Sequence, residues 1–390
     1  MADSHQKITR RKLFARTSQA AVATALGAEA LARGADATGD GPKPDPRTIV
    51  NHHPKMRYRK MGKTGYWISE VSLGGHWRNR GGGRYWDVFA KDDVPADVAK
   101  NRTEVMSACI DAGINYLDIT TAAECLSYGK ALKGRRDKMI VGADDHRLGP
   151  RNFANITVPK LTHNAEECIR RLGTDYLDIW RVQARMDGSN TEAHVEVMIE
   201  TAAKLIKAGK IRHFGMSSHN RDWLQKMIVR FPEIEMVIHP CTAVTKRAGA
   251  PATKDNVQEK VRKYSTAKDL ASSIFDTVRE KNVGLVTIKP FAGGSVFKNE
   301  NKFPIMGVGL KEENDLARLT LQCILACHEE ITCTVPGLTT VYEVDNAARA
   351  SYTRELAMSP ADRQWLEAAT REGLASLPPD YQWLRDWDVI

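Results

Sequence analysis

Acidic, imidazole and amide side chains recur directly after short apolar segments of this 390-residue chain. Asp144-Asp145-His146 is the densest group. Carboxylates and imidazoles can bind a divalent cation such as zinc, manganese or magnesium, and they can also transfer protons on a sugar or a hydroxy acid. A third reading is that they only fill a hydrated opening. We assign no metal ligand, because coordination geometry is not visible in a sequence. The full set is His76, Asp118, Glu124, Asp144, Asp145, His146, Gln183, Arg185, His219, His239 and Lys289.

The elements that must position these groups follow a repeated pattern. Eight short apolar segments alternate with amphipathic segments, which predicts an α/β fold of the (β/α)8 TIM-barrel type. Right-handed crossovers place the carboxyl ends of all strands on one face, where the active sites of such barrels lie. We therefore expect Asp118, Asp144, Gln183, Ser217 and Lys289 to be neighbours. The expected strands are Val71–Leu73, Tyr116–Ile119, Met139–Val141, Leu177–Val182, His213–Met216, Met236–Ile238, Gly284–Ile288 and Thr332–Val335, and the clearest helical segments are Arg102–Ala112, Asn164–Leu172, Val195–Ala208 and Ala267–Lys281.

The first 38 residues are typical of a signal peptide of the twin-arginine type. Thr9-Arg10-Arg11-Lys12-Leu13-Phe14 precedes a weakly apolar, alanine-rich segment and several small-x-small cleavage motifs. This pattern predicts export to the periplasm by the twin-arginine machinery, which would then be a partner of the chain; the alternative is a basic amphipathic helix. Residues 39–55 should form a linker, and residues 56–390 a barrel with an aromatic C-terminal tail.

Composition excludes several function classes. The chain is 42% apolar and 27% charged, as in ordinary globular proteins, and it lacks the run of about 18 apolar residues that stable membrane insertion requires. Its net charge of +9 is concentrated partly in the leader. The basic stretch Lys246–Lys268 has one aromatic residue, Tyr264, and is interpreted as a solvated loop, so we expect no nucleic-acid partner. The partner should be a small-molecule substrate, and the seven cysteines should mostly be buried thiols.

The order and spacing of several motifs resemble the aldo-keto reductase superfamily over about residues 57–352. The resemblance implies a (β/α)8 barrel that reduces carbonyl compounds with NADPH. It also implies a tyrosine acid flanked by a lysine, a histidine and an aspartate, a set in which the phenol protonates the substrate oxygen as hydride reaches the carbonyl carbon. The matching stretches are Arg59–Gly65, Ile114–Asp118, Gly129–Gly134, Arg171–Asp178, Gly209–Ser217, Lys289–Gly294 and Val335–Gly337.

The resemblance also implies that the catalytic set is altered. Asp118 matches the aspartate, whereas Ala123 stands in the place of the tyrosine, Asp144 in that of the lysine and Gln183 in that of the histidine. Asp118, Asp144 and Gln183 are therefore the candidate catalytic residues. Tyr128 could replace the acid only if its loop were re-registered, and its pattern predicts a helix.

At the cofactor end the resemblance implies a site for NADP or NAD. Ser217 and Ser218 resemble the pair that holds the carboxamide, and the turn after the seventh strand resembles the loop near the pyrophosphate. The segment after Gly337 offers no cation for a 2′-phosphate, and Glu343 would repel one. The candidate cofactor-binding residues are Ser217, Ser218, Lys289, Pro290, Gly293, Gly294 and Gly337.

Three functions agree with these observations. The first is an exported oxidoreductase, linked to NAD or NADP, that acts on a carbonyl, sugar or hydroxy compound. The second is a non-redox lyase or isomerase acting on carbohydrate, with a metal as one version. The third is a catalytically inactive barrel that binds a ligand.

Overall fold

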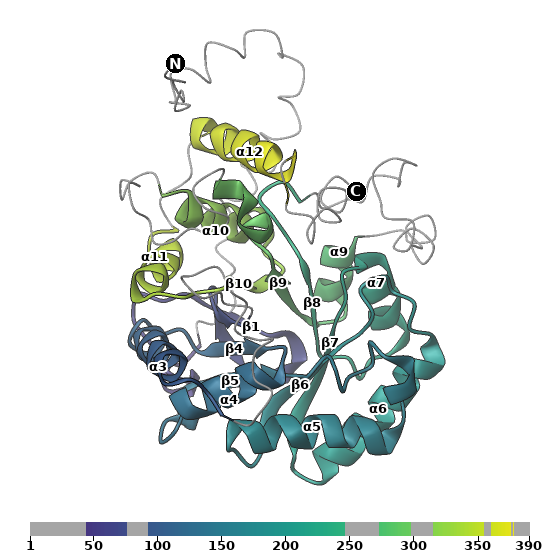
Figure 1. The fold of residues 1–390 in the computed structure, drawn as a ribbon. Coiled ribbons are helices and arrows are strands. Elements are labelled where there is room, and N and C mark those ends of the chain that lie inside the picture. Colours follow the sequence, from purple (N-terminus) through teal and green to yellow (C-terminus); the bar gives the residue numbers. More distant parts are fainter. Residues whose placement is uncertain are drawn as a thin grey trace, which may run out of the picture.

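The computed structural model describes residues 44–75, 93–245, 273–297, 315–354, 360–375 and 377. Its centre is an eight-stranded parallel sheet with strands in sequence order from β3 to β10 (Figure 1). All eight predicted strands are present. Their bounds are β3 Leu73–Gly74, β4 Tyr116–Ile119, β5 Ile140–Ala143, β6 Leu177–Gln183, β7 Ile211–Ser217, β8 Met236–Pro240, β9 Gly284–Ile288 and β10 Ile331–Val335.

The sheet closes on itself through its first and last strands. Val71 forms a parallel bridge with Thr334, and the Ser72 amide donates to the Thr334 carbonyl at 3.1 Å. Further along, the Gly74 amide donates to the Pro336 carbonyl at 3.2 Å. These bonds complete the ring, so the predicted (β/α)8 barrel is confirmed.

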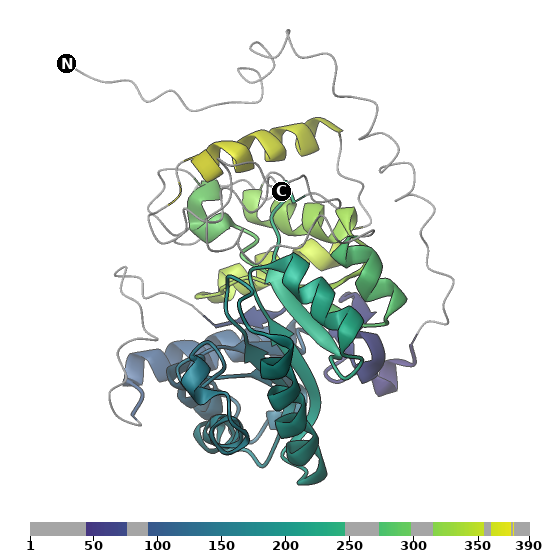
Figure 2. The same cartoon turned by 90° about the vertical axis from the view of Figure 1, so that its right-hand side faces the viewer.

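Helices surround the barrel on the outside (Figures 1 and 2). The helix α12 lies beyond this ring, where it packs against α10 and against the short helix η7, Ala292–Phe297. Glycine ends α5 as the sequence predicts: Gly173 has a φ of 63°, a left-handed conformation that glycine adopts without a steric penalty. The bounds are α3 Ala96–Asp111, α4 Ala122–Ala131, α5 Val158–Leu172, α6 Glu192–Lys207, α7 Arg221–Arg230, α9 Ile274–Glu280, α10 Leu316–Cys327, α11 Val341–Tyr352 and α12 Pro360–Ala375.

Alternate residues of each strand face opposite sides, because side chains in a strand have a period of two. On β4, Leu117 packs against the helices, whereas Tyr116 joins a separate cluster inside the barrel. An antiparallel hairpin of β1, Tyr58–Lys60, and β2, Trp67–Ser69, adds Met61 and Ile68 to that interior cluster. The interior is therefore a packed core, and the buried charged pair Asp118 and Arg181 lies toward its carboxyl-terminal end.

Part of the segment expected to be a linker contacts the barrel. Asn51 donates through Nδ2 to the Ile110 carbonyl at 2.9 Å, and Ile49 is buried. Several predicted segments lie outside the described residues: the leader, His76, most of the long loops expected at 76–99 and 243–267, the basic stretch 246–268 and the aromatic tail. No helix in the described ranges is both long and apolar enough to cross a membrane.

Candidate active site

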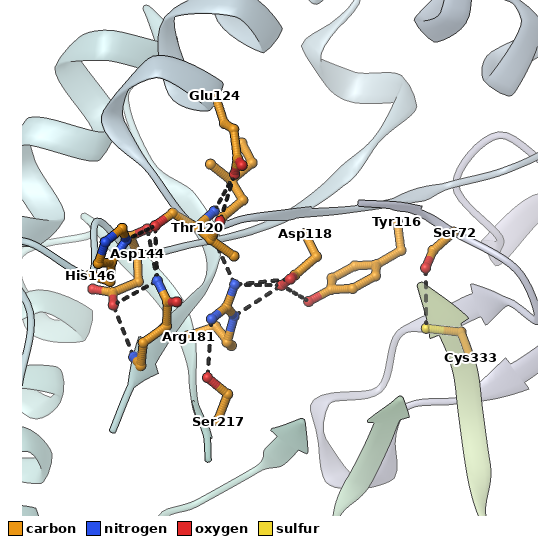
Figure 3. A network of polar contacts seen from close by, with 12 residues as sticks. Ser72, Tyr116, Asp118, Thr120, Glu124, Asp144, His146, Arg181, Ser217 and Cys333 are labelled. Carbon is orange, nitrogen blue, oxygen red and sulfur yellow. Dashed lines mark hydrogen bonds and ion pairs between the residues drawn. The ribbon is translucent and has the colours of Figure 1, made fainter. Parts of the chain in front are cut away.

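A buried ion pair occupies the polar end of the barrel. Asp118 on β4 and Arg181 on β6 both face inward, and both are almost fully buried. The guanidinium contacts the carboxylate through two hydrogen bonds, Nε to Oδ1 and Nη2 to Oδ2, each 2.9 Å long (Figure 3). It also donates to the Ile119 carbonyl and, through Nη1, to the Ser217 hydroxyl at 3.2 Å. Arg181 thus joins strands β4, β6 and β7 at one point.

Each charge of this pair stabilises the other, whereas burial disfavours the charged form of both residues. Burial raises the pKa of Asp118, and the Arg181 guanidinium opposes that rise. Burial is also the largest effect on Arg181 and lowers its pKa, but Asp118, Tyr116 and Asp144 together outweigh it, so the arginine pKa is raised. Because two hydrogen bonds join them, we treat the pair as charged. The sequence analysis missed Arg181; the available signal was an arginine in the middle of an apolar strand.

Tyr116 lies one layer deeper in the barrel than Asp118. Its hydroxyl donates to Asp118 Oδ1 at 3.5 Å (Figure 3). Burial raises the pKa of Tyr116 well above its ordinary value. A methyl group on Gly142, on the adjacent strand, would collide with that hydroxyl, so the phenol is tightly enclosed. Tyr116 is therefore a permanently protonated support for Asp118.

A second cluster joins the ends of β5 and β6. The Gln183 backbone amide donates to Asp144 Oδ2 at 2.9 Å, and the Gln183 side-chain Nε2 donates to the Thr120 carbonyl at 3.0 Å. Asp144 is fully buried, and within the described part of the chain its Oδ1 accepts no hydrogen bond. Burial raises the pKa of Asp144 to about 6, although Arg181 lowers it. Asp144 and Gln183 are thus in contact, as expected.

The Thr120 carbonyl oxygen is the meeting point of this cluster. It accepts the Gln183 side chain and also His146, whose Nδ1 is 3.1 Å away and whose amide nitrogen is 3.3 Å away. Thr120 is itself fixed, because its amide and hydroxyl both donate to Glu124 Oε2, at 2.7 and 2.9 Å. Glu124 lies in the first turn of α4, so this helix holds the carbonyl in place.

His146 is half-buried at this point, two residues beyond Asp144. A carbonyl oxygen only accepts hydrogen bonds, so Nδ1 must carry the proton, and Nε2 of the neutral ring has a free lone pair. Burial lowers the pKa of His146, although its bond to Thr120 works in the opposite direction. Arg151, from the same loop, lies near both Asp144 and His146; burial lowers its pKa to about 10, against the effect of Asp144.

The residues assigned to the cofactor lie at the ends of three strands, β7, β9 and β10. Ser217 contacts Arg181, whereas the Ser218 hydroxyl donates to the Arg185 carbonyl at 2.7 Å. Lys289 and Pro290 follow β9, two strands away from β7. Of the five residues expected to be neighbours, Asp118 and Ser217 are joined through Arg181, and Asp144 is joined to Gln183.

The turn after β9 has an unusual backbone. Lys289 and Ala292 have positive φ angles of 61° and 48°, followed by Gly293 at 67° and Gly294 at 89°. Positive φ is costly for residues with a Cβ and occurs often at sites that bind ligands. Hydrogen bonds from the Ala292 amide to the Lys289 carbonyl and from the Gly294 amide to the Phe291 carbonyl keep the turn compact.

The start of α11 carries a carboxylate. Glu343 Oε2 accepts from the Thr339 and Thr340 amides at 2.6 and 3.0 Å, while Gly337 just before them is exposed. The sequence offers no cation in this segment, but the fold brings one from α3: Arg102 Nη1 donates to the Leu338 carbonyl at 2.8 Å.

Tyr128 lies in a helix, as its pattern predicts: it is buried in α4, where its hydroxyl donates to the Gly74 carbonyl at 2.7 Å, so it does not supply the acid. One expectation is wrong. His239 is not at the barrel mouth; it faces outward from β8 and its ring contacts Phe275 of α9 edge-on.

Among the described residues, no three His, Cys, Asp or Glu side chains are arranged to hold a metal ion. Six of the cysteines are buried and unbridged.

Comparisons with known proteins give a consistent result. The model of the aldo/keto reductase family matches residues 86–349. The Glycine max protein named "Probable aldo-keto reductase 1" is 22% identical over 321 residues, which are 73% of this chain and 82% of that protein. A 6-dehydroglucose reductase of Novosphingobium aromaticivorans is 23% identical over 47% of this chain, and the match spans 61% of that protein.

Among solved structures, an aldo-keto reductase from Klebsiella pneumoniae in complex with NADPH superposes with a TM-score of 0.54. It is 16% identical, and the superposition covers 83% of this chain and 96% of that one. At this identity the likeness supports the barrel fold.

Proposed function

This chain belongs to the aldo/keto reductase family, and we propose that it is an exported oxidoreductase that uses NAD or NADP to interconvert a carbonyl compound and its alcohol. The observation that carries the proposal is the Asp118–Arg181–Ser217 cluster. It places a fixed cation at the carboxyl-terminal end of the barrel, on the face where (β/α)8-barrel enzymes have their active sites. Membership of this family favours an oxidoreductase over a lyase, an isomerase or a binding protein.

The residues present fit a dinucleotide. Bound nicotinamide would supply or accept the hydride. The compact turn Lys289–Gly294 would contact the pyrophosphate, and Ser217 and Ser218 would lie near the carboxamide. The NADPH complex of the Klebsiella relative supports this assignment. Glu343 disfavours a 2′-phosphate, because its carboxylate already occupies the Thr339 and Thr340 amides just before α11.

Arg181 replaces the cation that the family places on β5. Asp144 stands where the resemblance implies a lysine, so the positive charge beside Asp118 would be lost without a substitute. The guanidinium from β6 restores it. A fixed positive charge near the reacting oxygen stabilises the alkoxide character that develops during hydride transfer.

A sugar derivative is the first substrate to test, because one relative is a 6-dehydroglucose reductase. Export is proposed from the twin-arginine pattern in the first 38 residues. The N-terminus of protein isolated from a cell envelope should lie near the alanine-rich motifs around residues 28–37. An intact Met1 in that fraction would contradict export by cleavage.

Cofactor binding is tested by titrating the full chain with NADH and NADPH and following nicotinamide fluorescence. We expect saturable binding, tighter for NADH. If neither dinucleotide binds at millimolar concentration, the proposed function is wrong.

A further inference from the structure

Interconversion of a carbonyl and an alcohol at the mouth of the barrel, the opening at the carboxyl ends of its strands, requires a side chain that can donate or accept a proton. Among the described residues few side chains near this opening can do so. Gln183 does not titrate. Asp118 is held by Arg181, and Asp144 is fully buried. Tyr116 and Tyr128 are enclosed, with pKa values raised by burial.

His146 has the geometry that the others lack. Its imidazole and the Gln183 side chain converge on one acceptor, the Thr120 carbonyl, at 3.1 and 3.0 Å. Gln183 stands at the end of β6, where the resemblance implies a histidine. The loop after β5 therefore brings an imidazole to the place from which the β6 residue has been lost.

The contact with Thr120 also orients the ring. Because Nδ1 donates to the carbonyl, Nε2 is the nitrogen available for proton transfer. Thr120 is fixed by Glu124, so the ring rests on a rigid acceptor. The His146 side chain is only half-buried, so part of it remains accessible.

Charged groups from several elements surround the ring. Arg151 and Arg147 from its own loop disfavour the imidazolium, while Asp145 favours it. The Asp144 carboxyl lies at the end of β5, and Glu124 of α4 lies behind Thr120. Burial is the largest effect and lowers the pKa of His146, so the imidazole is neutral near pH 7 and acts as a base.

We propose that His146 is the catalytic residue that exchanges the hydroxyl proton of the substrate, through Nε2. The inference rests on the proposed function. In the oxidative direction, the substrate carbinol loses its hydroxyl proton to Nε2 and its carbon-bound hydrogen, as hydride, to the oxidised nicotinamide. The products are the carbonyl compound, the reduced dinucleotide and an imidazolium that returns the proton to solvent. Reduction reverses each step.

The test compares His146→Asn with wild type in the full-length protein. The asparagine amide can still donate to the Thr120 carbonyl, but it has no counterpart of Nε2. His163→Asn is the matched control, because His163 is exposed on α5. The probes are glucose, glycerol and lactate with NAD⁺ or NADP⁺, and dinucleotide affinity is measured by fluorescence for each protein.

We expect His146→Asn to bind dinucleotide within about twofold of wild type and to lose about 100-fold or more in kcat, as removal of a general base does. The wild-type kcat/KM should fall on acidification with an apparent pKa below the ordinary histidine value of about 6.5, and this limb should disappear in the variant. A His146→Asn enzyme with more than a third of wild-type kcat overturns the proposal.

If the protein oxidises none of these probes, chemical labelling of its histidines tests the role of His146 instead. Diethyl pyrocarbonate acylates neutral, accessible imidazole nitrogens, and peptide mass spectrometry identifies the modified histidine. We expect His146 to be labelled in the free protein and protected by saturating dinucleotide. Labelling of His163 should be the same with and without dinucleotide. Labelling of His146 that dinucleotide leaves unchanged overturns the proposal, whereas failure to bind any dinucleotide refutes the proposed function instead.

Discussion

Replacing Arg181 with methionine would leave the Asp118 carboxylate inside the barrel without its cation. The wild-type pair is joined by two 2.9 Å hydrogen bonds, and both side chains are almost fully buried. Removing one partner of such a pair typically costs about 3–5 kcal/mol, because the remaining charge is desolvated and uncompensated. We expect Arg181→Met to lower the free energy of unfolding by that amount at pH 7, measured by urea denaturation.

The cost should depend on pH in a defined direction. Without Arg181, burial raises the pKa of Asp118 in the folded state above the unfolded value of about 3.9. The folded protein then binds more protons than the unfolded chain, so its stability falls as pH rises from about 4 through the folded pKa. Arg181→Met should therefore be much closer to wild type at pH 4 than at pH 7.

A second substitution separates the charge from the lost packing. The double variant Asp118→Asn/Arg181→Met removes both charges and keeps most of the shape, so we expect it to recover a large part of the lost stability at pH 7. A loss below about 1 kcal/mol in Arg181→Met, or a loss independent of pH, would refute the view that the pair is a coupled, charged unit.

Three further predictions concern other parts of the site. Glu343→Gln should shift the ratio of NADPH to NADH affinity toward NADPH by about tenfold, since a change near 1.4 kcal/mol at a charged contact has that effect; an unchanged ratio in fluorescence titrations would show that Glu343 does not select the cofactor. Asp144→Asn should flatten the fall in stability between pH 4 and 6, because burial raises the pKa of Asp144 to about 6 and the wild type loses stability as pH rises through that value; equal pH dependence in urea denaturation would contradict this. Gly142→Ala should destabilise the fold by about 1–3 kcal/mol through the clash with the Tyr116 hydroxyl, and a neutral effect would mean that the interior can yield there.

Two residues of opposite charge lie on neighbouring strands at the mouth. The acid Asp144 directly follows β5, and the cation Arg181 lies on β6. The arginine lies near both acids, since it bonds Asp118 and lowers the pKa of Asp144. Because the interior has a low dielectric constant, neither acid would be tolerated there as readily without the guanidinium.

The sequence alone determined the architecture. Each strand from Tyr116–Ile119 onward is an apolar run flanked by an amphipathic helix, and such runs must be buried on both faces, as in a parallel barrel. The positions of Asp118, Asp144 and Gln183 at strand ends also followed, because in a parallel sheet every strand ends on the same side.

Only the tertiary structure decided which side chains meet. Whether a strand residue faces the axis or the helices depends on a period of two, and a shift of one residue reverses it; this is why His239 was expected at the mouth and lies outside it. Arg102 reaches Leu338 across more than 230 residues of chain, and His146 in the loop after β5 shares the Thr120 carbonyl with Gln183 at the end of β6. Such contacts depend on barrel closure and loop geometry, which local sequence patterns do not encode.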